Sequence, residues 1–132
     1  MFLLAFGAVL VFDQLTKALV VRSLAPRAIL SAGPIGLRHV QNRRLADNRK
    51  LVATSWLSMV AGGILVASTV LAASPSAQLA LGLAIGGATG NAVDLLRGRP
   101  VVDFVDLRIW PVFNLADAAI TAGVVLTLWT LR

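Results

Sequence analysis

Four long apolar runs dominate this sequence and limit what it can fold into. Each is close to the roughly 20 residues that a helix needs to cross the hydrocarbon core of a bilayer. The runs cover about 2–22, 51–73, 77–96 and 110–131. With 58% hydrophobic and 14% charged residues, the composition lies outside that of an ordinary soluble domain. The sequence therefore predicts an all-α membrane protein, a single domain over residues 1–132 with four transmembrane helices.

The first apolar run and the two connections that follow it each carry a structural signal. The first run lacks the basic start and small-residue cleavage site of a secretory signal, so we expect it to be a spanning helix. Residues 23–50 contain helix-breaking prolines and glycines, then weak alternation through "IGLRHVQN", which predicts a small strand-rich cap. The short "ASPSAQ" turn at 73–78 predicts that the second and third runs form an antiparallel hairpin.

Charge and composition exclude several classes of function. The formal net charge is +6, which could suggest a nucleic-acid partner, but the sequence lacks a basic face interleaved with aromatic residues. Anionic lipid headgroups are therefore the expected counter-charge. The absence of cysteine excludes a thiol nucleophile and a zinc–thiolate site. His39, the only histidine, lies among arginines and is expected to be solvated, which leaves little material for a serine triad.

Two pairs of polar residues lie within the apolar runs. Asp13 and Lys17 are four residues apart, and Asn91 and Asp94 are three apart, so each pair shares one helix face. A charged group at the bilayer centre costs about 3 kcal/mol on insertion scales and is a candidate functional residue. A self-neutralising ion pair, and close helix packing by the small residues of "GGATGNAVD", are the structural alternatives.

The stretch "VVDFVDLRIWPVFNLAD" carries the most specific chemistry. Asn114 and Asp117 suit the N-cap and first turn of the last helix, but capping does not explain Asp103. If the fold brings the two aspartates together, one of them keeps its proton, with Asp103 the expected protonated partner. Such a pair can activate water and protonate a peptide carbonyl. A carboxylate-only metal site and a proton or ion pathway remain alternatives.

Four blocks resemble the lipoprotein signal peptidases (signal peptidase II): "DQLTK", "GGATGNAVD", "VVDF" and "FNLAD", in that order. The resemblance implies a four-helix aspartyl endopeptidase of the bacterial cytoplasmic membrane, with an extracytoplasmic β-cradle after the first helix. It implies removal of signal peptides before a diacylglyceryl-modified cysteine, with membrane lipids as further partners and no metal or organic cofactor. It makes Asp103 and Asp117 the catalytic pair. The implied supporting residues are Asp13, Lys17, Asn42, Asn91, Asp94 and Asn114.

The sequence also departs from the family pattern. Arg44 stands where a glycine is usual in the cradle, and Leu95 stands where an arginine usually follows the helix-three aspartate. Helical spacing puts neither Arg97 nor Arg99 on the face of position 95. These changes bear on substrate recognition, and they leave open a non-catalytic or altered-specificity paralogue that binds signal peptides or lipid.

The expected orientation rests on two signals that disagree. Most of the 12 basic residues fall in the first and third connections, which the positive-inside rule would place in the cytoplasm. The resemblance places the same connections, and the active site, on the extracytoplasmic side. We expect the orientation that the resemblance implies.

Overall fold

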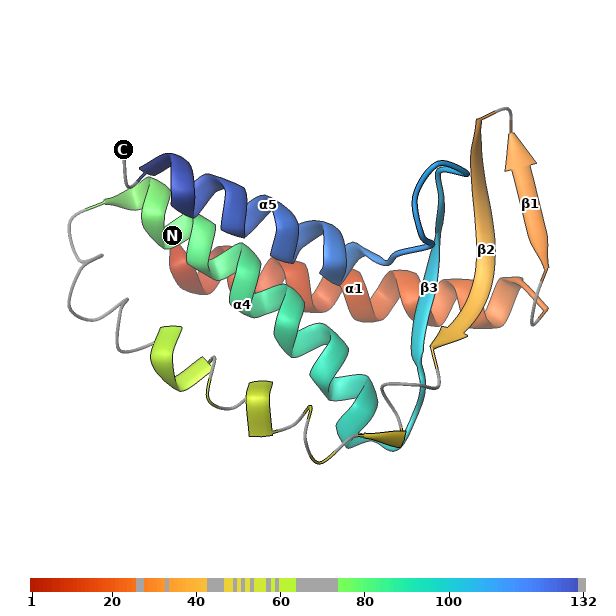
Figure 1. Cartoon of the computed structure of the whole chain (residues 1–132), viewed down its shortest axis with the longest axis horizontal. Helices are drawn as coiled ribbons and strands as arrows, with labels where there is room; N and C mark the ends of the chain where they lie inside the picture. The colour runs from red at the N-terminus through yellow and green to blue at the C-terminus, as the bar shows by residue number, and fades with distance from the viewer. Residues whose placement is uncertain are drawn as a thin grey trace.

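Three helices and a three-stranded sheet organise the part of the chain that the structure, a computed structural model, describes. The described residues are 1–25, 28–32, 34–42, 47, 48, 50, 52, 54–56, 58, 60–63 and 74–130. The elements are α1 (Phe2–Ser23), β1 (Ile29–Ala32), β2 (Ile35–Asn42), α4 (Pro75–Leu96), β3 (Val101–Asp106) and α5 (Leu115–Thr130). The sheet stands at one end of the helices, and both chain termini lie at the other end (Figure 1).

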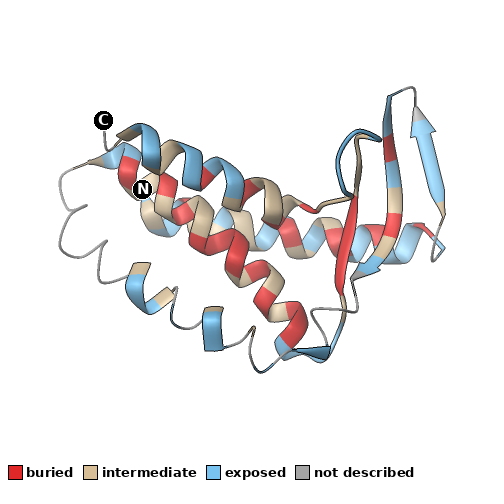
Figure 2. Ribbon diagram, viewed as in Figure 1, coloured by how far each residue is buried: buried red, intermediate tan, exposed pale blue. Residues whose placement is uncertain are grey.

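Helix α4 is the central helix and packs against both α1 and α5. It is the most buried of the three, whereas much of α1 is exposed (Figure 2). Glycines set these contacts: a Cβ on Gly87 would collide with the Ala116 carbonyl oxygen, and one on Gly90 would lie 2.6 Å from Asp13 Oδ2. The prediction that the small residues of this block allow close helix packing is therefore confirmed.

The predicted spans are confirmed in part. Among the described residues, α1 and α4 are the two helices long and apolar enough to cross a membrane, and α5 is a shorter apolar helix. Helix α1 exposes large apolar side chains, including Leu3 (77%) and Leu4 (73%), as a lipid-facing helix would. The second predicted span, 51–73, lies largely outside the described residues; those described within it are helical.

The last helix begins at Leu115 rather than at residue 110 as predicted. Residues 107–114 first return to the sheet, where the Phe113 carbonyl accepts hydrogen bonds from the backbone N–H groups of Phe104 (3.0 Å) and Val105 (2.8 Å). Pro111 has no N–H to continue a helical ladder. This loop therefore ties the start of α5 to the strand that carries Asp103.

The strand-rich cap predicted over 23–50 is confirmed by β1 and β2, which pair antiparallel. Strand β3, which we did not predict, adds to the other side of β2 and places Asp103 opposite Val40. The sheet is fixed to the end of α1 by an apolar core of Val20, Leu24, Val102 and Phe104. The third connection thus completes the cap that the first connection begins.

His39 is not solvated, and that expectation was wrong. Its side chain is 4% exposed, and Nδ1 lies 3.0 Å from the Leu24 carbonyl oxygen, within hydrogen-bonding distance. The reason is that β2 folds back against the carboxyl end of α1 and covers the ring. Nε2 is also buried and has no hydrogen-bond partner among the residues that the structure describes.

Candidate active site

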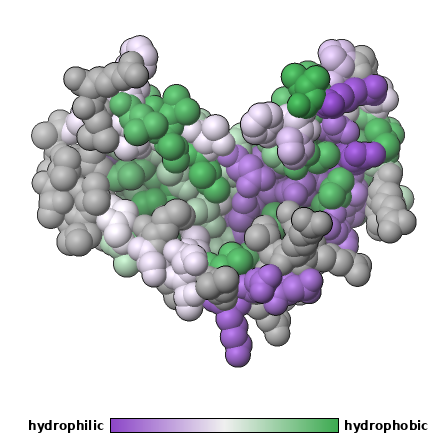
Figure 3. Space-filling view, viewed as in Figure 1, coloured by the Kyte–Doolittle hydropathy of each residue, from purple (hydrophilic) through white to green (hydrophobic). Residues whose placement is uncertain are grey.

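Polar side chains from α1, α4 and β3 and from the start of α5 meet near the sheet. We call this group the polar cluster. Its members are Asp13, Gln14, Lys17, Asn91, Asp94, Asp103, Asn114 and Asp117. In the space-filling view, hydrophilic residues gather near the sheet and hydrophobic ones cover much of the helical part (Figure 3). The cluster lies near the carboxyl end of α4 and at the amino end of α5, and it meets α1 at the middle of that helix and just beyond.

Asn114 and Asp117 cap the amino end of α5 reciprocally. Asn114 Oδ1 accepts the backbone N–H of Asp117 at 2.9 Å, and Asp117 Oδ2 accepts the backbone N–H of Asn114 at 3.2 Å. This is the capping-box arrangement, with asparagine and aspartate in the two roles. The predicted N-cap is confirmed, and it fixes the Asp117 carboxylate at the mouth of the helix.

Asn114 also connects the two aspartates of the predicted pair. Its Nδ2 donates to Asp103 Oδ1 at 2.8 Å and to Asn91 Oδ1 at 3.0 Å. Asn91 Nδ2 in turn donates to Asp117 Oδ1 at 2.8 Å. Asn114 is fully buried, with 0% exposure. Hydrogen bonds through the side-chain amides of Asn114 and Asn91 thus connect Asp103 to Asp117, although the two aspartates are not neighbours in the sequence.

Lys17 contacts the same network of amide hydrogen bonds, and its ammonium group lies close to three acceptor oxygens. Its Nζ is 2.8 Å from Asp13 Oδ2, 2.8 Å from Asp94 Oδ2 and 2.8 Å from Asn91 Oδ1. The predicted Asp13–Lys17 pair within α1 is therefore formed, but Lys17 also bridges to α4. Through Asn91, the ammonium group is one hydrogen-bonded residue away from Asp117.

Asp13 has a second contact that the sequence did not predict. Its Oδ1 accepts the backbone N–H of Ala116 at 3.0 Å, in the first turn of α5. A carboxylate there satisfies a helix N–H group that has no partner within its own helix and interacts favourably with the helix dipole. This contact explains why Asp13 can be completely buried, with 0% exposure. It also fixes α5 relative to α1.

Gln14 is a member of the cluster that sequence reasoning missed. Its Nε2 donates to the Gly90 carbonyl at 3.1 Å and approaches Asp94 Oδ1 at 3.4 Å. Its Oε1 accepts a hydrogen bond from Arg97 Nη1 at 3.1 Å. Its position beside Asp13 in "DQLTK" was the available signal in the sequence. Glutamine is uncharged, however, so it does not stand out as a candidate functional residue within an apolar helix.

The remaining predicted positions lie at the margin of the cluster. Asn42 pairs with Val101 at the end of β2, and its side chain lies outside the described part of the chain, as does Arg44. Leu95, where the family usually has arginine, is buried in the packing. Arg97 donates to Gln14, which in turn lies within hydrogen-bonding distance of Asp94. Arg97 can reach Gln14 because α4 ends at Leu96 and the chain turns there.

The donor set suits acid–base chemistry better than metal binding. Among the described residues, no three His, Cys, Asp or Glu side chains are grouped so that they could hold a metal ion. Lys17 already forms ion pairs with both Asp13 and Asp94. Asp103 and Asp117 are positioned instead by amide N–H donors, an arrangement that can orient two carboxyl groups for proton transfer.

Comparison with known proteins gives a consistent result. A family profile described as "Signal peptidase (SPase) II" matches residues 5–132. The lipoprotein signal peptidase of Moorella thermoacetica is 43% identical over 141 residues, covering 98% of this chain and 91% of the relative. That of Syntrophomonas wolfei is 39% identical over 131 residues, covering 94% and 87%.

Solved structures agree with the sequence relatives. Two structures described as bacterial membrane enzymes, determined by the in meso method at 1.9 and 2.3 Å resolution, align with TM-scores of 0.89 and 0.90 at 25% and 26% identity. They cover 98% of this chain, and the alignment covers 90% and 85% of theirs. The resemblance carried by the four motif blocks is therefore confirmed: the chain belongs to the signal peptidase II family and is an aspartic-type membrane peptidase.

Proposed function

We propose that this enzyme removes signal peptides from lipoprotein precursors, cutting before a cysteine that carries a diacylglyceryl group. We further propose that Asp103 and Asp117 activate the attacking water. The relatives named lipoprotein signal peptidase support the substrate class. The observation that carries the proposed dyad is the bridging role of Asn114, whose side chain donates to Asp103 and whose backbone N–H donates to Asp117.

The two carboxyl groups have different surroundings, which suggests different roles. Asp117 accepts N–H groups from Asn91 and Asn114 at the amino end of α5, whereas Asp103 lies on β3 and accepts the side-chain N–H of Asn114. Asp117 would take a proton from water as the water attacks the peptide carbonyl. Asp103 would donate its proton to the carbonyl oxygen. When the tetrahedral intermediate collapses, the C–N bond breaks, the proton held by Asp117 passes to the leaving amine, and the proton on the former carbonyl oxygen returns to Asp103.

The position of the cluster suits a lipid-anchored substrate. Helices α1 and α4 are long enough to span the membrane, and the cluster lies between the middle of α1 and the carboxyl end of α4, near β3 of the sheet. A cysteine whose acyl chains lie in the bilayer would present the preceding peptide bond at this depth. We therefore propose that the sheet and the cluster face the extracytoplasmic side, where signal peptides emerge.

The test is a cleavage assay with a diacylglyceryl-modified precursor in liposomes. Asp103→Asn and Asp117→Asn should each lower the cleavage rate by at least about 100-fold, the usual contribution of an acid or base. Asp106→Asn is the matched control, because Asp106 lies on the same strand but interacts with Arg38 and the Arg108 backbone instead of the cluster. Its rate should remain within about twofold of the unmodified enzyme.

Two outcomes would count against the proposal. Cleavage that survives either cluster substitution would remove that aspartate from the catalytic pair. A folded, unmodified chain that binds the precursor but does not cut it, while a relative cuts it alongside, would favour the non-catalytic paralogue.

A further inference from the structure

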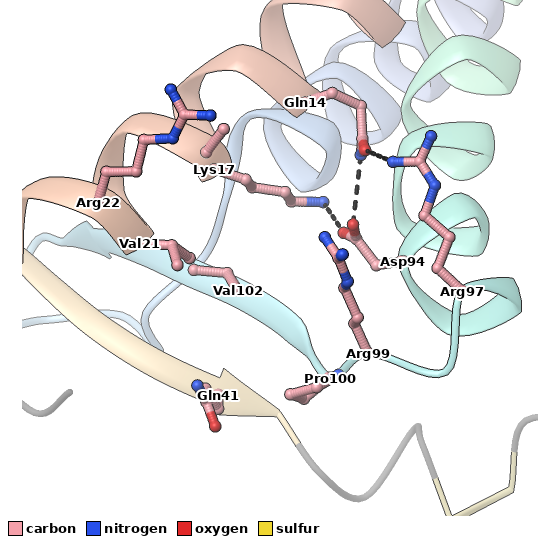
Figure 4. A pocket seen from close by; sticks show the side chains of 11 residues that line it. Gln14, Lys17, Val21, Arg22, Gln41, Asp94, Arg97, Arg99, Pro100 and Val102 are labelled. Carbon is pink, nitrogen blue, oxygen red and sulfur yellow. Dashed lines mark hydrogen bonds and ion pairs between the residues drawn. The ribbon is translucent and has the colours of Figure 1, made fainter.

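A cavity of about 570 Å³ lies beside the polar cluster and is lined mainly by the carboxyl-terminal halves of α1 and α4 together with β3 and the residues before it. We call it the basic pocket. Its charged lining residues are Lys17, Arg22, Asp94, Arg97 and Arg99 (Figure 4). Nothing in the proposed cleavage reaction uses the three arginines.

The basic pocket is distinct from the proposed catalytic pair. Pro100 and Val102 line it, and successive side chains along a strand point to opposite faces, so Asp103 is directed away from it. Neither Asn114 nor Asp117 lines the pocket. The two sites share a wall, formed by the ion pair of Lys17 and Asp94.

The charge of the basic pocket is unbalanced. Asp94 is its acidic lining residue, and that carboxylate is already paired with Lys17 at 2.8 Å. Arg97 donates to the neutral side chain of Gln14, and it extends alongside Asp94 as Arg99 does (Figure 4). Within the part of the chain that the structure describes, Arg22 and Arg99 form no ion pair. An anion is the ligand that this excess charge favours.

The type of anion follows from the donors and from the pocket's position. Guanidinium groups match the paired oxygens of a phosphate and bind it through two hydrogen bonds. The pocket also has an apolar part, which includes Ala18 and Val21. Leu19 and Leu96, near it on the two spanning helices, are 60% and 64% exposed, which places the pocket at the boundary between acyl chains and headgroups.

We infer that the basic pocket binds a phosphate group, supplied by the headgroup of an anionic phospholipid. Arg97 and Arg99 hold the phosphate, and the apolar wall accommodates the glycerol end of the acyl chains. This inference concerns lipid binding alone, so it stands or falls independently of the proposed peptide cleavage.

The experiment measures lipid binding to the full-length protein by native mass spectrometry, with phosphatidylglycerol and phosphatidylcholine as probes. The unmodified chain should prefer phosphatidylglycerol. Arg99→Gln should weaken phosphatidylglycerol binding about fivefold, the effect expected for one basic residue near an anionic headgroup. Arg108→Gln removes the same charge from an exposed position in the same connection, outside the pocket, and should leave binding within about twofold.

Further arms separate the source of the phosphate and guard against misfolding. Displacement of phosphatidylglycerol by millimolar inorganic phosphate would support a phosphate site that soluble ions can also fill, and no displacement would support a site specific for the lipid. Arg99→Lys, which keeps the charge but not the paired donors, should bind with an affinity between those of the unmodified chain and Arg99→Gln. Equal binding by Arg99→Gln and Arg108→Gln, with both proteins folded, would overturn the inference.

Discussion

Lys17 shows how a single residue can make a charged cluster tolerable inside apolar helices. It is 4% exposed and lies between the carboxylates of Asp13 and Asp94, so its removal would leave two acids without their cation. Breaking a buried ion pair by removing one partner costs about 3–5 kcal/mol, because the remaining charge stays desolvated. The Asp13–Lys17 ion pair is thus formed, and Lys17 belongs at the same time to the polar cluster.

Lys17→Met should therefore lower the free energy of unfolding by about 3–5 kcal/mol, measured by denaturation with sodium dodecyl sulfate in mixed micelles. Arg22→Met is the control, since Arg22 lies on the same helix but is exposed and should change stability by less than about 0.5 kcal/mol. Equal stability of the two variants would contradict the role assigned to Lys17.

Asn114 combines helix capping with the connection between the aspartates, and two substitutions can separate these roles. Asn114→Ser keeps an oxygen that can accept the Asp117 N–H, whereas Asn114→Ala does not. Alanine should therefore be about 1 kcal/mol less stable than serine. Both variants should lose about 100-fold in cleavage rate, because neither holds Asp103 through an amide group. A serine variant with full activity would show that capping alone explains Asn114.

At the scale of elements, the contact between α4 and α5 positions the amino end of α5. Gly87 allows it, since a Cβ there would collide with the Ala116 carbonyl oxygen. Gly87→Ala should destabilise the protein by about 1–3 kcal/mol and reduce cleavage by displacing Asn114 and Asp117. The control is Gly7→Ala, which meets nothing within 4 Å and should stabilise α1 by up to about 1 kcal/mol. Thermal unfolding in detergent measures both, and similar effects would contradict the packing argument.

Apolar length and strand alternation in the sequence predict α1, α4 and β2, because these signals are local. Strand β3 was not predicted, because "VVDFVD" is short and its pairing with β2 is a contact between distant parts of the chain. The start of α5 was misplaced for a related reason: residues 110–113 are apolar, yet the backbone of Phe113 hydrogen-bonds to β3 instead of continuing the helix.

The site residues likewise divide into those that local sequence patterns predict and those that depend on contacts between distant parts of the chain. Motif blocks identified every cluster residue except Gln14, and local spacing predicted both the Asp13–Lys17 pair and the Asn114 cap. The bond from Ala116 to Asp13 joins positions 103 residues apart, so no local pattern could reveal it. The burial of His39 depends likewise on how the sheet folds against α1.

At the scale of the whole molecule, the sheet and the chain termini lie at opposite ends, so orientation can be tested from two positions (Figure 1). The chain has no cysteine, so single cysteines can serve as labels. Ser31→Cys on β1 should react with a membrane-impermeant maleimide in intact cells. Ser76→Cys, exposed near the other end, should react only after the membrane is permeabilised. The reverse pattern would place the sheet in the cytoplasm, as the positive-inside rule suggests.

The most direct test of the proposed chemistry is the cleavage rate of Asp103→Asn, Asp117→Asn and the double variant. Two carboxyl groups that act as one acid–base unit are lost together when either is removed. Each single variant should therefore lose at least about 100-fold, and the double variant should be no more than a few-fold slower than the slower single variant. Losses that multiply in the double variant, or a single variant that retains more than about a tenth of the rate, would contradict a shared catalytic pair.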